Sequence, residues 1–251
     1  MKQVLLIICL ISSLCTRAEK VYDFDATCQQ AYQEIFALRI DNGLQLIKKA
    51  KQEKPDNLIP VLLDNYADFF VLFLNDDPVF YQQHKTLINK RLNLLEDGPD
   101  NHPFHRVAQS VMYLQRAAIE VRLGALRSAG FDGWKAYRLL KENDEKFPGF
   151  APNDLLFGSM QAVAGTIPKN YQWLVGLFGV KGNLQKGLQR VSNFANGNGF
   201  WQKLMQNDAA FIYCYLQFYI GNNRDAVFQF MQNRKLDLVH TQVFTFMAAN
   251  L

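Results

Sequence analysis

YQWLVGLFGVKGNLQKGLQRV, the stretch Tyr171–Val191, decides the fold that we expect for the whole chain. Apolar residues recur at helical spacing on both sides of a corner that holds Gly179 and Gly182, which predicts two short helices joined by a tight turn. Gly187 has no side chain to hold a neighbouring helix away, so we expect it at a helix crossing. The rest of the chain contains more helix pairs with small residues at corresponding places.

Nearly all of the chain after residue 24 has helical periodicity, and the sequence lacks the sustained alternation that indicates strands. Asp25, Asp77 and Asp132 are predicted N-caps, and Gly130 is predicted to end a long helix. This pattern predicts an all-α protein. The expected helices span residues 26–40, 42–53, 58–75, 78–95, 103–128, 133–146, 154–166, 200–220, 225–232 and 237–251.

Short loops make these helices antiparallel neighbours, which either a closed bundle or an open row of helix pairs would satisfy. Small residues recur at one place in several pairs, and this recurrence favours an irregular α-α helix-pair superhelix. The predicted structural helix-corner residues, expected where paired helices turn or approach closely, are Gly43, Gly124, Ala136, Gly179, Gly182, Gly187, Gly221 and Ala226.

Several of these groups resemble tetratricopeptide repeats, in which small residues lie where two helices cross and a proline follows the second helix. Leu123-Gly124, Ala136, Leu140 and Pro148 reproduce the spacing of the Leu-Gly…Ala…Phe…Pro pattern of that family. The intervals between groups differ from the regular step of about 34 residues, so the resemblance implies irregular pairs. The other groups are Ala31, Gly43, Ile47, Ala50 and Pro55; Gly182, Gly187 and Val191; and Gly221, Ala226 and Phe230.

The opening stretch also carries a narrower resemblance. It looks like the signature of the tetratricopeptide-repeat-39 and inclusion-body-clearance proteins, a eukaryotic family with a Ser…Pro run, a Leu-rich helix, a glycine corner and a Gly-Leu helix start. The resemblance implies a large helical-repeat protein and identifies no substrate. The matching residues are Ser159, Pro168, Leu174, Leu177, Phe178, Gly179, Gly182, Gly187 and Leu188.

Residues 1–18 have the pattern of a signal peptide: Lys2 precedes an apolar run over residues 4–11, and small residues end at Ala18. We therefore expect a mature helical-repeat domain over residues 19–251, exported to the periplasm or cell envelope. Two alternatives are a lipoprotein anchored through Cys15 and a buried N-terminal helix. The last expected helix has no partner after it, so either it packs back on the preceding helix or the chain is the N-terminal part of a longer array.

Removal of Lys2 and Arg17 with the signal leaves 25 basic and 23 acidic residues, a net charge of +2, which implies no nucleic acid partner. No later segment is long and apolar enough to predict a transmembrane helix. Lysines at 48, 49, 51 and 54 are expected to form a solvated face, with peripheral envelope association as the alternative. Cys28 and Cys214 are expected to be buried and unpaired, although an exported protein could also pair them.

No motif predicts catalysis, a cofactor or a metal site. The glycines of the opening stretch lack the spacing of phosphate-binding loops. His102 and His105, near Asp97 and Asp100, lack a third ligand at a diagnostic spacing. Reactive serine or cysteine arrangements are also absent.

Four aromatic residues, Tyr171, Trp173, Trp201 and Tyr215, are candidates to line a concave groove that takes a peptide or a partner helix. We therefore expect a non-catalytic scaffold that binds a protein or peptide partner. The alternative is an all-α envelope enzyme or small-molecule-binding protein whose site assembles only in the fold.

Overall fold

A computed structural model describes residues 19–75, 77–166, 180, 182–239 and 241–250. Within these residues the chain forms twelve α-helices, one π-helical turn and no strand, and its one β-type pairing is an isolated bridge between Val21 and Asn57. The all-α prediction is therefore confirmed.

Most of the helices are two to six turns long. In the described part of the chain, none combines the length and the apolar character that crossing a bilayer requires. Their bounds are α2 (Ala26–Phe36), α3 (Ile40–Glu53), α4 (Ile59–Asn75), α5 (Pro78–Glu96), α6 (Pro103–Arg122), α7 (Leu126–Lys146), α8 (Pro152–Ala164), α10 (Leu184–Asn196), α11 (Phe200–Leu204), α12 (Gln206–Tyr215), the π-helical turn η2 (Leu216–Ile220), α13 (Arg224–Arg234) and α14 (Gln242–Asn250).

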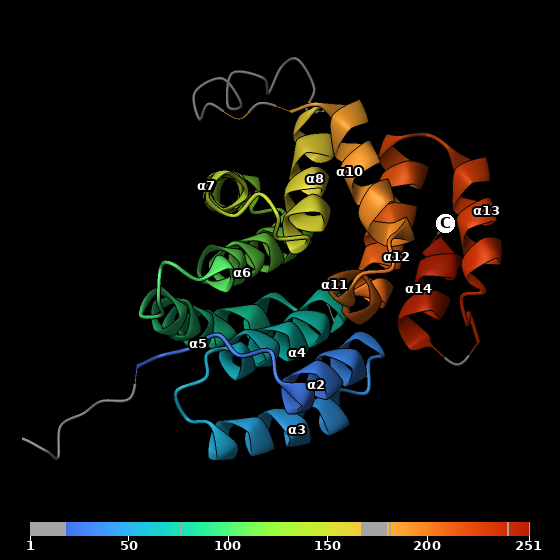
Figure 1. Cartoon of the computed structure of the whole chain (residues 1–251). Helices are drawn as coiled ribbons and strands as arrows, with labels where there is room; N and C mark the ends of the chain where they lie inside the picture. Colours follow the sequence, from blue (N-terminus) through green and yellow to red (C-terminus); the bar gives the residue numbers. More distant parts are fainter. Residues whose placement is uncertain (1–18, 76, 167–179, 181, 240, 251) are drawn as a thin grey trace, which may run out of the picture.

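The helices form pairs that follow one another around an arc (Figure 1). Packing is most extensive between α6 and α7, between α8 and α10, and between α2 and α3. The helix axes turn from pair to pair, so that α2 and α3 run nearly crosswise to α8 and α10 in Figure 1. Buried apolar residues from every pair, from Ile35 in α2 to Met247 in α14, join one continuous core. The arrangement is the expected irregular row of helix pairs, bent until its two ends meet.

Several helix starts are where the sequence predicts them. Asp25 caps α2 by accepting a hydrogen bond from the Cys28 N–H, and Asp77 caps α5 in front of Pro78. His102 caps α6 by accepting from the Phe104 N–H. These caps satisfy backbone donors that have no partner inside the helix.

The break between α6 and α7 is not where it was predicted. The backbone turns at Gly124, whose φ of +75° is the left-handed conformation that glycine adopts without strain. The Gly124 N–H donates to the Val121 carbonyl and the Ala125 N–H to the Glu120 carbonyl, which is the Schellman arrangement. Gly124 therefore lies at a helix corner, as expected, but no close approach of another helix requires it, because a Cβ there would meet no described atom within 4 Å.

Asp132 does not cap a helix, because α7 continues through it. Its buried carboxylate instead accepts two hydrogen bonds from the Arg116 guanidinium, one of them 2.6 Å long from Nη2. This charge-assisted pair joins α6 to α7 and raises the pKa of Arg116. Gly130 also lies inside α7, where a Cβ would meet nothing within 4 Å, and so does not end the helix.

The glycines of the opening stretch mark a crossing of α10 with α8. A Cβ at Gly187 would overlap the backbone of Ala162 and lie 2.5 Å from the Gly158 carbonyl oxygen. A Cβ at Gly182 would overlap the backbone around Gly165. The predicted partner of this helix was the preceding half of the stretch, which lies in residues 167–179, outside the described residues. Helix α8, which showed no match to the repeat pattern, is the helix that packs on α10.

The other predicted small residues differ in their surroundings. Gly43 lies against α2, because a Cβ there would be 2.6 Å from Ile35 Cγ1. Ala136 is fully buried in α7. Gly221 approaches only the flexible side chains of Gln217 and Leu188 in addition to its own helix. Ala226 is half-buried, and its N–H is capped by the Asn223 side chain, so it lies at a helix start.

Residues 19–25 form an extended strap along the loop between α3 and α4. The Val21 N–H donates to the Asp56 carbonyl over 3.0 Å, and the Leu58 N–H donates to the Val21 carbonyl over 2.8 Å. The Asn57 side chain accepts from the Asp23 N–H and donates to the Asp23 carbonyl. The strap is therefore held by backbone hydrogen bonds as well as by side chains such as Tyr22 and Phe24, and no residue pattern in the sequence predicted it.

Gly187→Ala is expected to destabilise the protein by about 1–3 kcal/mol, because the added Cβ forces α8 and α10 apart. The measurement is the free energy of unfolding from a urea titration followed by circular dichroism. Gly130→Ala is the matched control: its Cβ has open space, so its higher helix propensity should stabilise the protein by about 0.5–1 kcal/mol. If Gly187→Ala instead stabilises the protein as the control does, the two helices do not cross at Gly187.

Candidate functional site

Trp201 lies where three separate parts of the arc meet. Its ring centroid is 5.8 Å from that of Phe24, 5.2 Å from that of Phe104 and 5.5 Å from that of Phe150. Phe104 also contacts Phe24 and Phe150, so the four rings form one cluster, the aromatic hub. Helix α11 carries the half-buried Trp201 ring into contact with the chain's own aromatic residues, and its role in lining a groove stays a prediction.

Tyr215 belongs to a row of rings on α12 and η2 that we call the aromatic ladder (Phe211, Tyr215, Phe218 and Tyr219). Neighbouring centroids are 4.6 Å apart for Phe211 and Tyr215 and 5.5 Å apart for Tyr215 and Tyr219. Tyr215 is half-buried, whereas the Tyr219 side chain is 57% exposed. The ladder therefore runs from half-buried rings that pack against the core to an exposed ring at the surface. The other two predicted groove aromatics, Tyr171 and Trp173, lie outside the described residues, as does Gly179.

A π-helical turn places the outer rings of the ladder. The Gly221 N–H donates to the Leu216 carbonyl five residues earlier, over 2.8 Å. This wider turn changes the direction of the side chains that follow Tyr215, and such turns recur at functional sites of helices. No residue pattern in the sequence predicted it.

A buried hydrogen bond joins the first helix of the arc to the far end. Tyr32 of α2 donates its hydroxyl to Asp208 Oδ2 of α12 over 3.1 Å. Burial raises the pKa of Asp208 to about 7, and the hydrogen bond from Tyr32 offsets part of that rise. Tyr66 of α4 faces the same carboxyl group, and burial raises the pKa of both tyrosines. In the folded protein this carboxyl group therefore titrates near neutral pH.

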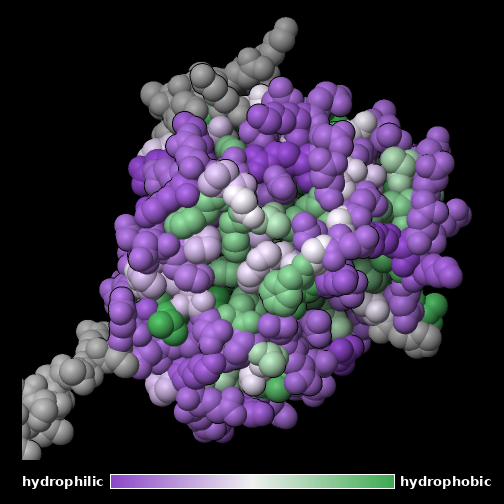
Figure 2. Space-filling model, in the orientation of Figure 1, coloured by the Kyte–Doolittle hydropathy of each residue, from purple (hydrophilic) through white to green (hydrophobic). Residues whose placement is uncertain are grey.

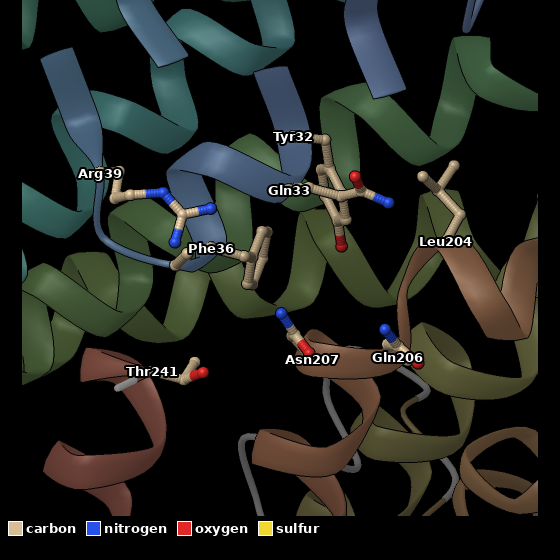
Figure 3. Close-up of a pocket in the computed structure, with 9 residues that line it drawn as sticks. Tyr32, Gln33, Phe36, Arg39, Leu204, Gln206, Asn207 and Thr241 are labelled. Carbon is tan, nitrogen blue, oxygen red and sulfur yellow. The ribbon is translucent and has the colours of Figure 1, made fainter. Parts of the chain in front are cut away.

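A pocket of about 270 Å³, the junction pocket, opens beside this bond (Figure 3). Figure 3 shows side chains from α2 and its following loop on one side and from α11 and α12 on the other. Residues from both ends of the arc therefore line the same pocket. Its lining includes Tyr32, Gln33, Phe36 and Arg39 on the first side, Leu204, Gln206 and Asn207 on the second, and Thr241 before α14.

The positive charge of Arg39, which lines the junction pocket, is paired with the carboxylate of Glu34. Arg39 donates to both carboxylate oxygens of Glu34, over 2.5 and 2.8 Å, and holds the pKa of Glu34 below its ordinary value. The carboxamides of Gln33, Gln206 and Asn207 form no hydrogen bond within the described part of the chain. The pocket therefore presents neutral donors and acceptors rather than a net charge.

The surface around the inner helices is apolar. Figure 2 shows apolar side chains gathered near the middle of the face presented in Figure 1, within a rim of hydrophilic ones. Figure 1 places α6, α8, α11 and α12 around this region. On this face, the centre of the arc is therefore apolar and its edge is hydrophilic.

The two histidines considered for a metal site have structural contacts. Tyr22 of the strap stacks on His102 with centroids 5.5 Å apart, and its hydroxyl lies 3.5 Å from His105 Nδ1. Burial lowers the pKa of both histidines, so they are neutral at neutral pH. In the residues that the structure describes, no group of three or more His, Cys, Asp or Glu side chains could hold a metal ion.

Cys28 and Cys214 are both buried, and the structure has them as free thiols. Burial raises the pKa of each thiol, which disfavours the reactive thiolate. The pairing that the sequence left open is therefore not formed here.

Sequence reasoning missed Asp208 and Gly158. An aspartate in the first turn of a helix is normally explained by the helix dipole, so the sequence did not predict that Asp208 is buried. The signal that could have identified it is its position in the apolar series Leu204, Phe211 and Tyr215, at intervals of three and four residues, which places it on the buried side.

A comparison with protein-family models finds no match, and neither does a comparison with curated proteins or with solved structures. The functional assignment therefore depends on the geometry described above.

Asp208→Asn is expected to stabilise the protein above pH 7. In wild type the folded state keeps the Asp208 proton up to about pH 7, whereas the unfolded chain loses it near pH 3.8, so unfolding releases a proton in this range and stability falls as pH rises through it. Asparagine cannot ionise and still accepts from Tyr32, so this loss should disappear, a gain of up to about 4 kcal/mol at pH 8.

The measurement is the urea unfolding free energy of both proteins from pH 4 to pH 8. Asp225→Asn, an exposed aspartate in the first turn of α13, is the control and should keep the wild-type pH dependence. Parallel wild-type and Asp208→Asn curves would show that Asp208 is ionised normally in the fold.

Proposed function

We propose that this protein is an exported helical-repeat scaffold of the cell envelope that binds a protein or peptide partner and has no catalytic activity. The observation that carries the proposal is the aromatic ladder, a row of half-buried to exposed rings that packs against the core. We also propose that its helix pairs are degenerate tetratricopeptide-like units. The close approaches at Gly43 and Gly187 support this.

The ladder has the chemistry of an interface anchor. Aromatic side chains supply large contact areas at a low entropic cost, and a tyrosine adds a polar hydroxyl at its tip. The Arg224 guanidinium lies 4.8 Å from the Phe218 ring centroid, which adds a cation beside the rings. Because α12 and η2 pack into the common core, these groups are held in place before a partner arrives.

Export is supported by the position of the predicted cleavage site. Cleavage after Ala18 would leave Glu19 as the first residue, and Val21 makes the first backbone hydrogen bonds of the strap. Cleavage there would therefore keep the whole strap in the mature chain. The small net charge of the mature chain supports a protein partner over a polyanion.

An enzyme is the second candidate, and one observation favours it. Asp208 has a pKa of about 7 and accepts a hydrogen bond from Tyr32, which lines the junction pocket, so one side chain separates a group that can exchange a proton at neutral pH from the pocket. A general acid–base role for Asp208 would require turnover that Asp208→Asn abolishes. The scaffold proposal expects partner binding to persist in that variant.

A photo-crosslinking residue at position 219 is expected to capture a partner from an extract of the cell envelope. The same residue at position 228 is the matched control, because Phe228 is 51% exposed on α13 and lies outside the ladder. Crosslinked species should appear at 219, be identifiable by mass spectrometry, and weaken when Tyr215→Ala is added. Identical capture at both positions, or capture at neither, would contradict a docking role for the ladder.

Mass spectrometry of the protein isolated from the cell envelope is expected to find Glu19 as the N-terminal residue. Cleavage follows the small residues that end at Ala18. The control is Ala18→Leu, which should delay processing and leave a longer chain. A wild-type protein that retains Met1 would contradict the export proposal, and lipid attached to Cys15 would show the alternative anchoring.

A further inference from the structure

We propose that the junction pocket binds a secondary amide group, the neutral group with one N–H donor and one carbonyl acceptor that peptides and N-acetylated amino sugars share. This site goes beyond the scaffold function, because none of the four ladder residues lines the pocket. The inference is based on three properties of the pocket: its carboxamides, its charge balance and its position.

The carboxamides supply matching hydrogen-bonding groups. Gln33 lies on the α2 side, and Gln206 and Asn207 lie on the α12 side (Figure 3). Each offers an NH₂ donor and a carbonyl acceptor, and none of the three has a partner in the described part of the chain. A secondary amide placed between them can donate to one side and accept from the other.

The charge balance selects a neutral ligand. Arg39 is the one ionic residue among those that line the pocket, and Glu34 already holds its guanidinium through two hydrogen bonds. A charged ligand would lose hydration and gain no free counter-charge, which is unfavourable. A neutral ligand avoids this cost.

The pocket also offers apolar surface of limited size. Phe36 and Leu204 contribute to opposite sides, and the Tyr32 hydroxyl is already committed as a donor to Asp208. A volume of about 270 Å³ suits a small group such as an acetamide or a short peptide segment, and not a folded domain. The methyl or side-chain carbon next to the amide would contact Phe36 and Leu204.

The position of the pocket couples binding to the shape of the arc. A bound amide would contact α2 and α12 together, which are the two elements joined by the Tyr32–Asp208 hydrogen bond. Occupancy should therefore stabilise the closed arc by mass action.

The test is a titration of ¹⁵N-labelled full-length mature protein, followed by NMR, with two amide probes at millimolar concentration. N-acetylalanine N-methylamide represents the peptide source, and N-acetylglucosamine represents the amino sugar source. Either probe, or both, should shift the side-chain NH₂ signals of Gln33, Gln206 and Asn207. The responding probe identifies the source.

Two ligand controls match these probes. The tertiary amide made by N-methylating the alanine probe lacks the N–H donors, and glucose lacks the acetamide. Both should bind at least several-fold more weakly than their parent probes. Equal binding of a parent and its control would overturn the proposal, as would the absence of any shift with both amide probes.

Two protein variants locate the site. Gln33→Leu and Asn207→Leu each remove one carboxamide at similar size and should weaken the responding probe about two- to tenfold. Gln82→Leu, which changes an exposed carboxamide on α5, should leave its affinity unchanged. Circular dichroism first establishes that each variant is folded. Unchanged affinity in both pocket variants would overturn the proposal even if crosslinking at position 219 supports the scaffold.

Discussion

The contact between the two ends of the arc is the constraint on which the rest of the structure depends. Trp201 packs on Phe24, Phe104 and Phe150, which come from three separate segments of the chain. Close by, Tyr32 donates to the buried Asp208. An open row of helix pairs would expose more of these rings to water, so their contact favours the bent arrangement. The junction pocket exists because this closure is incomplete beside Asp208.

The local geometry of each pair makes this curvature possible. Gly187 and Gly158 let the backbones of α10 and α8 approach closely, whereas Gly43 of α3 leaves room for the Ile35 side chain of α2. Arg116 and Asp132 instead join α6 to α7 by charge. Because the pairs are held by different contacts, they differ in spacing and angle, and the array is irregular.

The sequence was most informative about helix starts and close helix crossings, because one or two residues determine each of them. The helix caps at Asp25, Asp77 and His102 follow from side-chain chemistry that acts within one turn. The crossing at Gly187 follows from the need for a small residue where two helices touch. The break at Gly124 was missed because Gly130 and Gly133 give the same signal, and only the backbone conformation distinguishes them. Of the candidate site, the sequence predicted Tyr215 and Trp201 as important aromatics. It predicted neither the role of Trp201 in closing the arc nor the Tyr32–Asp208 bond, because both depend on contacts between residues far apart in the chain.

The separation between Tyr32 and Asp208 has a consequence for the order in which the chain folds. These residues are 176 positions apart, and no contact between them can form until α12 has been synthesised and released. Contacts of such long range add a loop-closure cost before they contribute stability. A chain that is delivered from its N-terminus therefore keeps the Tyr32 face of α2 uncovered while most helix pairs are already complete. The last quarter of the sequence thus protects the first helix, and a chain interrupted before α12 displays an aromatic surface of the kind that chaperones and proteases recognise.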